Sequence, residues 1–161
     1  MAEAPESFLS LFVADEAGTA DLAARLAERL QTGDVILLEG TLGAGKTAFS
    51  RELIRALAGD PDLVVASPTF TFSQVYDDQP LQVTHFDLYR MGEPEEVFDL
   101  GWDDALADGL TLVEWPDKLG QLRPESALTL TLGLVEGDET ARQISLSGNA
   151  AWQQRLAGFS A

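Results

Sequence analysis

The chain has 161 residues, of which 45% are hydrophobic, and this predicts a single globular domain over residues 1–161. Its 27 acidic and 10 basic residues give a formal net charge of −17, which disfavours direct binding along a nucleic-acid backbone. Cysteine is absent and histidine occurs once, which excludes disulfide bonds and zinc sites built on thiolates or several imidazoles. Because no basic start precedes an apolar core and no apolar run is long enough to span a bilayer, we expect a cytoplasmic protein without membrane attachment.

The first part of the chain alternates strand-like and helix-like segments. An apolar pattern predicts a strand at residues 8–13, and "TADLAARLAERL" predicts a helix with Thr19 as its N-cap. The leucines on one stripe of this helix are Leu22, Leu26 and Leu30. The short apolar run "VILLEG" then leads into a glycine-rich segment, and "KTAFSRELIRALAG" predicts a helix that ends at Gly59.

The rest of the chain contains several more strand patterns. "VVASPTFTFSQVY" (64–76), "LQVTHFDL" (81–88) and "LTLVEW" (110–115) predict strands, and "EPEEVFDLGWDDAL" predicts a helical stretch between the last two. Near the C-terminus, "SALTLTLGLV" and "ARQISLSG" flank the turn-forming "EGDE", so we expect a β-hairpin and then a short final helix. These elements predict an α/β fold.

The segment "GTLGAGKT", residues 40–47, fits the phosphate-binding pattern G-x-x-x-x-G-K-[ST] and lies between a predicted strand and a predicted helix. Its glycines let backbone N–H groups turn towards phosphate oxygens, Lys46 adds a positive charge, and the Thr47 hydroxyl is suited to Mg²⁺. The residues expected to contact the nucleotide here are Thr41, Leu42, Gly43, Ala44, Gly45, Lys46, Thr47 and Ala48. A plain glycine-rich turn with an exposed lysine is disfavoured, because only two lysines occur in the chain and one completes the pattern.

Two carboxylates follow the pattern expected for a metal and a hydrolytic water. Glu114 comes directly after the apolar residues of "LTLVEW" and is the first candidate for a second Mg²⁺ ligand, the alternative being a solvated acid at a strand end. On a strand of period two, Asp87 faces away from Phe86, so its carboxylate can hold the metal through water or orient the attacking water. His85 on the same strand is more typical of a structural residue than of a catalyst, and Arg90 is suited either to a phosphate or to supporting the carboxylates.

Hydroxyl side chains and an aromatic residue complete the candidate site. "SPTFT", residues 67–71, offers Ser67, Thr69 and Thr71 in the region where other P-loop proteins sense the γ-phosphate, although a proline-bounded strand entry explains the segment equally well. Trp115, directly after the candidate metal ligand, packs either in the core or near the nucleotide.

Together, "GTLGAGKT", "SPTFT" with "HFDLYR", and "EWP" resemble the TsaE (YjeE) family in their order and spacing, from about Val35 to Pro124. The resemblance implies a P-loop NTPase-like, three-layer fold in which helices cover both faces of a mixed central sheet. It implies ATP and Mg²⁺ as ligands, and binding to the TsaB and TsaD subunits of the bacterial machinery that makes threonylcarbamoyladenosine (t6A) beside the anticodon of certain tRNAs. ATP hydrolysis would support repeated turnover by that machinery, whose other subunits would hold the tRNA.

The resemblance also implies roles for individual residues. Lys46 and Thr47 would hold phosphates and Mg²⁺, Glu114 would bind the metal, Asp87 and Thr69 would serve hydrolysis or its sensing, and Trp115 would lie near the nucleotide. Many relatives have an acid where this chain has Thr41, which leaves the role of that side chain open.

Other functional classes use the same phosphate loop. A small-molecule kinase usually adds an arginine-rich lid, and the eight arginines of this chain form no cluster after "EWP". A GTPase is disfavoured because the N-K-x-D pattern is missing. A nucleotide-gated protein-binding module remains an alternative, and the acidic stretch at 93–109 fits either a solvated face or a docking surface.

Overall fold

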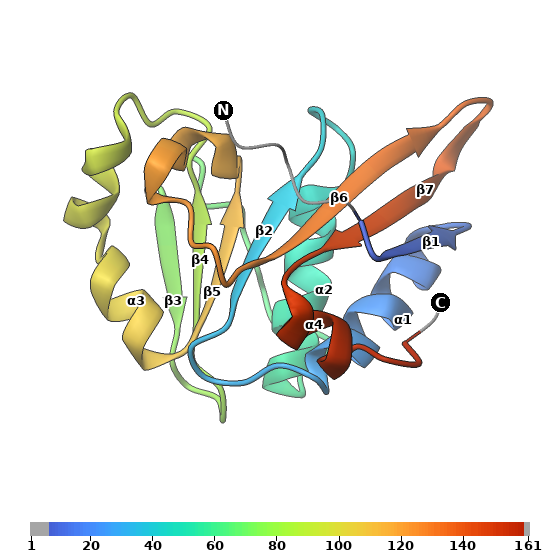
Figure 1. Cartoon of the computed structure of the whole chain (residues 1–161), viewed down its shortest axis with the longest axis horizontal. Coiled ribbons are helices and arrows are strands. Elements are labelled where there is room, and N and C mark those ends of the chain that lie inside the picture. The colour runs from blue at the N-terminus through green and yellow to red at the C-terminus, as the bar shows by residue number, and fades with distance from the viewer. Residues whose placement is uncertain (1–6, 160–161) are drawn as a thin grey trace.

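The computed structural model describes residues 7–159, and its centre is a mixed seven-stranded sheet in the order β1-β7-β6-β2-β5-β4-β3 (Figure 1). Four strands are parallel: β4 (Val83–Asp87), β5 (Leu110–Glu114), β2 (Val35–Glu39) and β6 (Leu128–Val135). Every residue of β4 and β5 is buried, as expected for parallel strands covered on both faces. The parallel arrangement places the carboxyl ends of β2, β5 and β4 side by side, at the same end of the strands.

Antiparallel strands complete both edges of the sheet. β3 (Ser73–Tyr76) pairs with β4, while β7 (Asp138–Ser147) pairs with β6 and β1 (Leu9–Val13) pairs with β7. The turn between β6 and β7 contains Glu136 and Gly137, so the expected C-terminal hairpin is confirmed.

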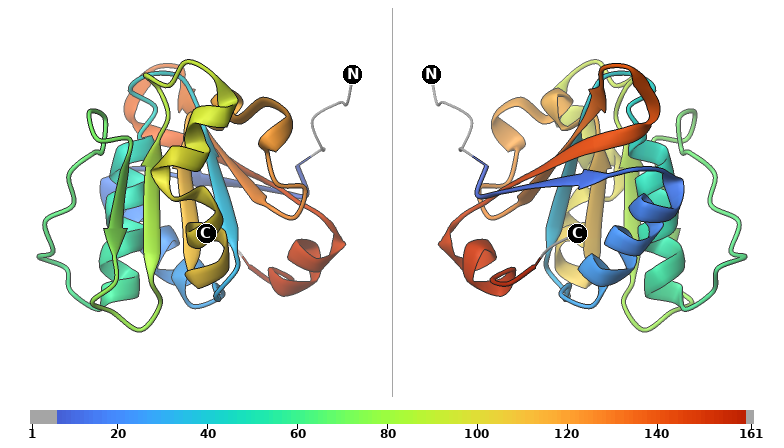
Figure 2. Two further views of the ribbon diagram at one scale, coloured as in Figure 1. Left: turned by 90° about the vertical axis from the view of Figure 1, so that its left-hand side faces the viewer. Right: turned by 90° about the vertical axis from the view of Figure 1, so that its right-hand side faces the viewer.

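Helical layers cover both faces of the sheet (Figure 2), which confirms the expected three-layer α/β fold. On one face, α1 (Glu16–Ala27) and α2 (Lys46–Ala58) bury Leu22, Leu26, Phe49 and Leu53 against the strands. On the other face lie the 3₁₀ segments η1 (Pro94–Leu100) and η2 (Pro116–Leu122) and the short helix α3 (Trp102–Asp108). The last helix, α4 (Ala150–Arg155), contacts the segment just before β6, where the Trp152 indole N–H donates to the Ser126 carbonyl at 2.8 Å. Within residues 7–159, no helix combines the length and the apolar character needed to cross a membrane.

The boundaries of α2 agree with the sequence pattern, whereas α1 begins and ends about three residues earlier than the pattern predicts. Gly59 ends α2 in the left-handed conformation (φ 68°), as expected. The prediction that Thr19 caps the first helix is wrong, because Asp15 accepts the Gly18 N–H at 2.9 Å and the helix begins at Glu16. An aspartate one turn earlier is at least as good a cap as threonine, and it places Thr19 inside the helix.

The predicted strand at 64–76 is wrong over most of its length, because only Ser73–Tyr76 are in a strand. Residues before it form a turn in which Phe72 donates its N–H to the Pro68 carbonyl at 2.7 Å and adopts φ 68°. Proline has no N–H for a sheet, and a left-handed Phe72 turns the chain out of the strand direction. The helical stretch at 93–106 is likewise broken at Gly101 (φ 82°) into η1 and α3.

Gly109, at the start of β5, permits a close approach of two backbones. A Cβ atom there would lie 2.2 Å from the Gln82 carbonyl oxygen, which accepts the Leu110 N–H at 2.8 Å. We therefore expect Gly109→Ala to lower the free energy of unfolding by about 1–3 kcal/mol, measured by urea denaturation. Gly133→Ala is the matched control, since its added Cβ meets the Gln143 carbonyl at an ordinary 3.6 Å and should change stability by less than about 0.5 kcal/mol. Equal stability of the two variants would contradict the close-approach argument.

Candidate nucleotide-binding site

The glycine-rich segment is a compact loop between β2 and α2. Gly40 has φ 151°, and a Cβ atom at this position would lie 2.7 Å from the Leu132 carbonyl oxygen of β6, so only glycine fits there without a shift. Gly45 is left-handed (φ 106°) and directly precedes α2. Its N-cap position carries no side-chain acceptor, so the first N–H groups of α2 lie at a positive helix end that favours an anion.

Lys46 is buried inside this loop. Its ammonium donates to the carbonyl oxygens of Gly40 and Thr41, at 2.5 and 3.0 Å, and its Nζ lies 3.9 Å from the ring centroid of Trp115. The aromatic face stabilises the cation, and the two carbonyls hold it at the mouth of the loop. Burial lowers the pKa of Lys46, while the nearby carboxylates of Glu114, Asp87 and Asp117 raise it and so oppose that effect.

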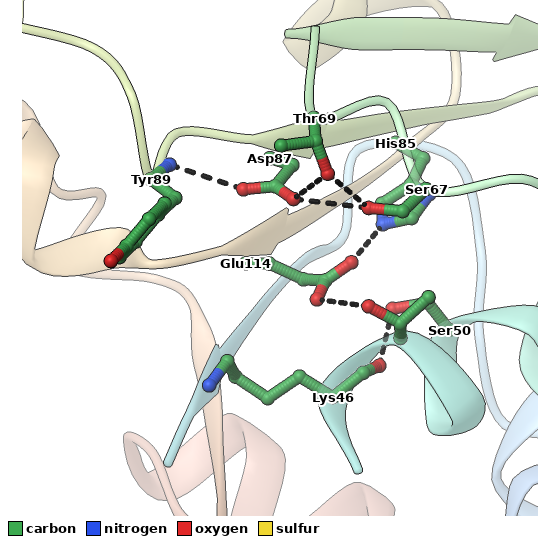
Figure 3. Close-up of polar contacts among 9 residues, drawn as sticks. Lys46, Ser50, Ser67, Thr69, His85, Asp87, Tyr89 and Glu114 are labelled. Carbon is green, nitrogen blue, oxygen red and sulfur yellow. Dashed lines mark hydrogen bonds and ion pairs between the residues drawn. The ribbon is translucent and has the colours of Figure 1, made fainter. Parts of the chain in front are cut away.

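Glu114 lies at the end of β5, beside β2 on one side and β4 on the other (Figure 3). Its side chain is 2% exposed, and its two oxygens have separate partners. The Thr47 hydroxyl donates to Oε1 at 3.0 Å, and Nε2 of His85 lies 2.7 Å from Oε2. The two residues predicted as metal ligands, Thr47 and Glu114, are therefore in direct contact.

Asp87 lies next to Glu114 because the two residues are register partners in β4 and β5. Its Oδ2 atom is within 3.1 Å of the Ser67 hydroxyl and 3.2 Å of the Thr69 hydroxyl, and its Oδ1 accepts the Tyr89 N–H at 3.1 Å (Figure 3). The hydroxyl oxygens of Ser67 and Thr69 also lie 2.9 Å from each other. Two hydroxyls of "SPTFT" thus join the site, whereas the Thr71 hydroxyl donates to the Ser73 carbonyl.

The remaining candidates lie around this centre. Trp115 adopts φ 59° and packs against Tyr89 with ring centroids 4.8 Å apart, which turns its indole towards Lys46 instead of into the core. Arg90 is exposed, and its guanidinium lies over the Phe70 ring at 5.0 Å. Thr41 and Leu42 form the exposed outer rim of the loop, while Ala44 is buried and Ala48 is half-buried.

Sequence reasoning missed one residue that shapes the loop. Arg142 of β7 donates from Nε to the Ala44 carbonyl at 2.8 Å, across 98 positions of sequence. Next to it, a cavity of about 500 Å³ opens between the loop and the tip of the hairpin. Its lining residues are Gly43, Leu134, Val135, Gly137, Asp138, Glu139 and Arg142. No local pattern reports this contact, since it depends on how the hairpin packs over the loop.

A glycine loop between a central strand and a helix, with a buried acid at the end of the adjacent parallel strand, defines a P-loop protein of the α/β class. Residues 13–144 match the family model described as threonylcarbamoyl adenosine biosynthesis protein TsaE, and the chain belongs to this family. The resemblance drawn from the motifs is thereby confirmed.

Individual relatives agree with the family match. The chain is 37% identical to the tRNA threonylcarbamoyladenosine biosynthesis protein TsaE of Rickettsia felis over 141 residues, covering 88% of this chain and 81% of the relative. It is 37% identical to the protein of the same name from Bacillus subtilis, covering 73% and 72% of the two chains. The crystal structure of YdiB from Bacillus subtilis superposes with a TM-score of 0.75 at 27% identity, over 98% of this chain and 96% of that one.

The contact between Trp115 and Lys46 predicts an optical signal for nucleotide binding. Phosphates in the loop would draw the Lys46 ammonium away from the Gly40 and Thr41 carbonyls. The electric field that this charge exerts on the Trp115 indole should therefore change. We expect ATP with Mg²⁺ to change tryptophan fluorescence, and Trp115→Phe to remove most of that change.

Trp102→Phe serves as the matched control for this signal. Trp102 is buried on the other face of the sheet, with its ring 5.3 Å from that of Phe86, so the variant should keep the wild-type response. A response that survives in Trp115→Phe and is lost in Trp102→Phe would contradict the assignment.

Proposed function

We propose that the chain binds ATP with Mg²⁺ and hydrolyses it to ADP and phosphate, as the ATPase component of the machinery that makes t6A in tRNA. The observation that carries this proposal is the 3.0 Å hydrogen bond between Thr47 and Glu114 at the phosphate loop. This hydrogen bond brings together the hydroxyl and the carboxylate that a P-loop enzyme uses to hold its metal, in a chain that belongs to the TsaE family.

The residues present suit a Mg²⁺ ion and phosphates. The Thr47 hydroxyl and the Glu114 carboxylate are hard oxygen donors, the type that Mg²⁺ prefers, and they already lie side by side. The first N–H groups of α2 and the Lys46 ammonium would hold the phosphate oxygens. Thr47 and Glu114 would hold the Mg²⁺ ion, which would offset the charge that develops on the phosphates during transfer.

The second carboxylate has the surroundings of a water-orienting group. Asp87 is held on one oxygen by the Tyr89 N–H and on the other by the hydroxyls of Ser67 and Thr69, so its plane is fixed beside Glu114. We assign to Asp87 the orientation of the attacking water, with Thr69 sensing the γ-phosphate. Trp115 covers Lys46 and limits the access of bulk water to this charge.

The rest of the nucleotide would extend towards the hairpin. Glu114, Asp87 and Trp115 occupy the β5 side of the loop, whereas the cavity beside Gly43 lies open on the β6 side. A base and ribose would fit against Leu134 and Val135 there, with Thr41 and Leu42 at the outer rim.

The family membership leads us to propose a cytoplasmic, single-domain protein that acts with the TsaB and TsaD subunits, without direct nucleic-acid or membrane binding. The net charge of −17 supports a role in which other subunits hold the tRNA, because it opposes tRNA binding by this chain. Partner stimulation is also proposed, because Arg90 lies over Phe70 and Arg142 donates to the Ala44 carbonyl of the loop, so a partner could supply a further cation for the phosphates.

The proposal predicts slow steady-state ATP hydrolysis by the purified chain with Mg²⁺, and faster hydrolysis when purified TsaB and TsaD are added. Lys46→Ala and Glu114→Ala should each lower the rate by ~100-fold or more, because each removes a charge that acts on the phosphates or their metal. Lys118→Ala is the matched control, since it removes the only other lysine, outside the loop, and should retain the rate.

Two results would overturn this assignment. Hydrolysis that the partners do not stimulate would favour a nucleotide-gated binding module, in which ATP only controls docking. Phosphate transfer to a small-molecule acceptor instead of water would favour a kinase.

A further inference from the structure

His85 lies directly behind the candidate metal ligand, in the interior of β4. Its side chain is 0% exposed, and its Nε2 atom lies 2.7 Å from Oε2 of Glu114, one of the shortest polar contacts in the site. No step of the proposed hydrolysis uses His85. Figure 3 shows the imidazole on the far side of the Glu114 carboxylate from Lys46.

The direction of this hydrogen bond depends on the tautomer of His85. Towards an ionised carboxylate, which only accepts hydrogen bonds, Nε2 of His85 must carry the hydrogen and donate it. Among residues 7–159, Nδ1 of His85 has no hydrogen-bond partner. The imidazole therefore makes one polar contact in this part of the chain, and that contact is with Glu114.

The orientation of the Glu114 carboxylate depends on its donors. The last torsion of a glutamate is broad and nearly two-fold, so the side chain itself does not fix the plane of the carboxylate. A buried carboxylate also needs donors for its oxygens to offset the cost of leaving water. Thr47 supplies a donor to Oε1 and His85 supplies one to Oε2, and the two bonds together fix the plane.

We propose that His85 is a positioning residue for Mg²⁺, which keeps Oε1 of Glu114 on the Thr47 side by holding Oε2. This inference rests on the proposed function, in which Thr47 and Glu114 hold the metal. Partners that orient metal ligands from outside the coordination shell typically contribute 10–100-fold to metal affinity. His85 should therefore set the Mg²⁺ concentration at which ATP binds tightly, and should leave metal-free nucleotide binding unchanged.

The test measures ATP binding by Trp115 fluorescence over a series of Mg²⁺ concentrations. His85→Leu should raise the Mg²⁺ concentration at half-maximal effect by about 10–100-fold. His85→Gln should recover most of the loss, because its amide N–H reaches the same carboxylate as Nε2. Binding measured in EDTA should be equal in all variants.

Thr111→Val is the matched control. Thr111 lies on the neighbouring strand β5, is buried like His85, and its hydroxyl has no partner among residues 7–159. Its replacement changes a buried polar side chain without touching Glu114, so the Mg²⁺ dependence should match that of the wild type. A shift in Thr111→Val as large as that in His85→Leu would show a general packing effect and overturn the proposal.

A measurement on the unmodified protein covers the case in which His85→Leu does not fold. His85 is the only histidine of the chain, so ¹⁵N NMR of the untagged protein gives one unambiguous imidazole. We expect the hydrogen on Nε2, and a shift of the Nε2 resonance when Mg²⁺ is added to the ATP-bound protein. A hydrogen on Nδ1, or an Nε2 resonance that ignores Mg²⁺, would overturn the proposal.

The wild-type protein distinguishes failure of the proposed function from failure of the role assigned to His85. If ATP binding by the wild-type chain does not depend on Mg²⁺, the proposed function fails and this inference fails with it. If the wild type depends on Mg²⁺ and His85→Leu shows the same dependence, only the role of His85 is overturned.

Discussion

The burial of one carboxylate at the end of β5 is the constraint on which the site depends. Glu114 is surrounded by protein because β5 lies between β2 and β4 in the interior of the sheet. Parallel register places Leu38 of β2 and Asp87 of β4 opposite it. The loop that follows β2 must then begin beside the same carboxylate, which brings Thr47 within hydrogen-bond distance. One strand order thus assembles the loop and both acids without any contribution from long surface segments.

The loop itself is supported from several directions. Gly40 allows its backbone to approach the Leu132 carbonyl, Arg142 holds the Ala44 carbonyl, and Lys46 folds back on the carbonyls of Gly40 and Thr41. A binding loop that is held in shape before its ligand arrives loses less conformational entropy on binding. The hairpin of β6 and β7 therefore contributes to the site through its backbone and one arginine, although it lies at the other end of the sequence.

Much of this arrangement was predictable because it follows from local rules. The phosphate loop has a fixed spacing, Glu114 follows an apolar strand, and α2 ends at a glycine, so each could be placed from a short window. The strand predicted across 64–76 is wrong over residues 64–72, because the hydroxyls of this segment bind Asp87 and its backbone turns at Phe72, an outcome that apolar alternation does not encode. The pairing of His85 with Glu114 and the contact of Arg142 with the loop need the register of distant strands, which one sequence does not determine.

Charge balance links the acidic composition to the proposed metal. The centre of the site holds two carboxylates, Glu114 and Asp87, against the single ammonium of Lys46, so a triphosphate would enter a region without surplus positive charge. The net charge of −17 adds a repulsive field at longer range. Like charges at these distances repel strongly when they are shielded from water. A divalent cation held by Glu114 and Thr47 would offset the negative charge of the two carboxylates and so reduce their repulsion of the phosphates. In a chain with this composition, the cation is therefore expected to strengthen nucleotide binding, in addition to its effect on the rate of hydrolysis.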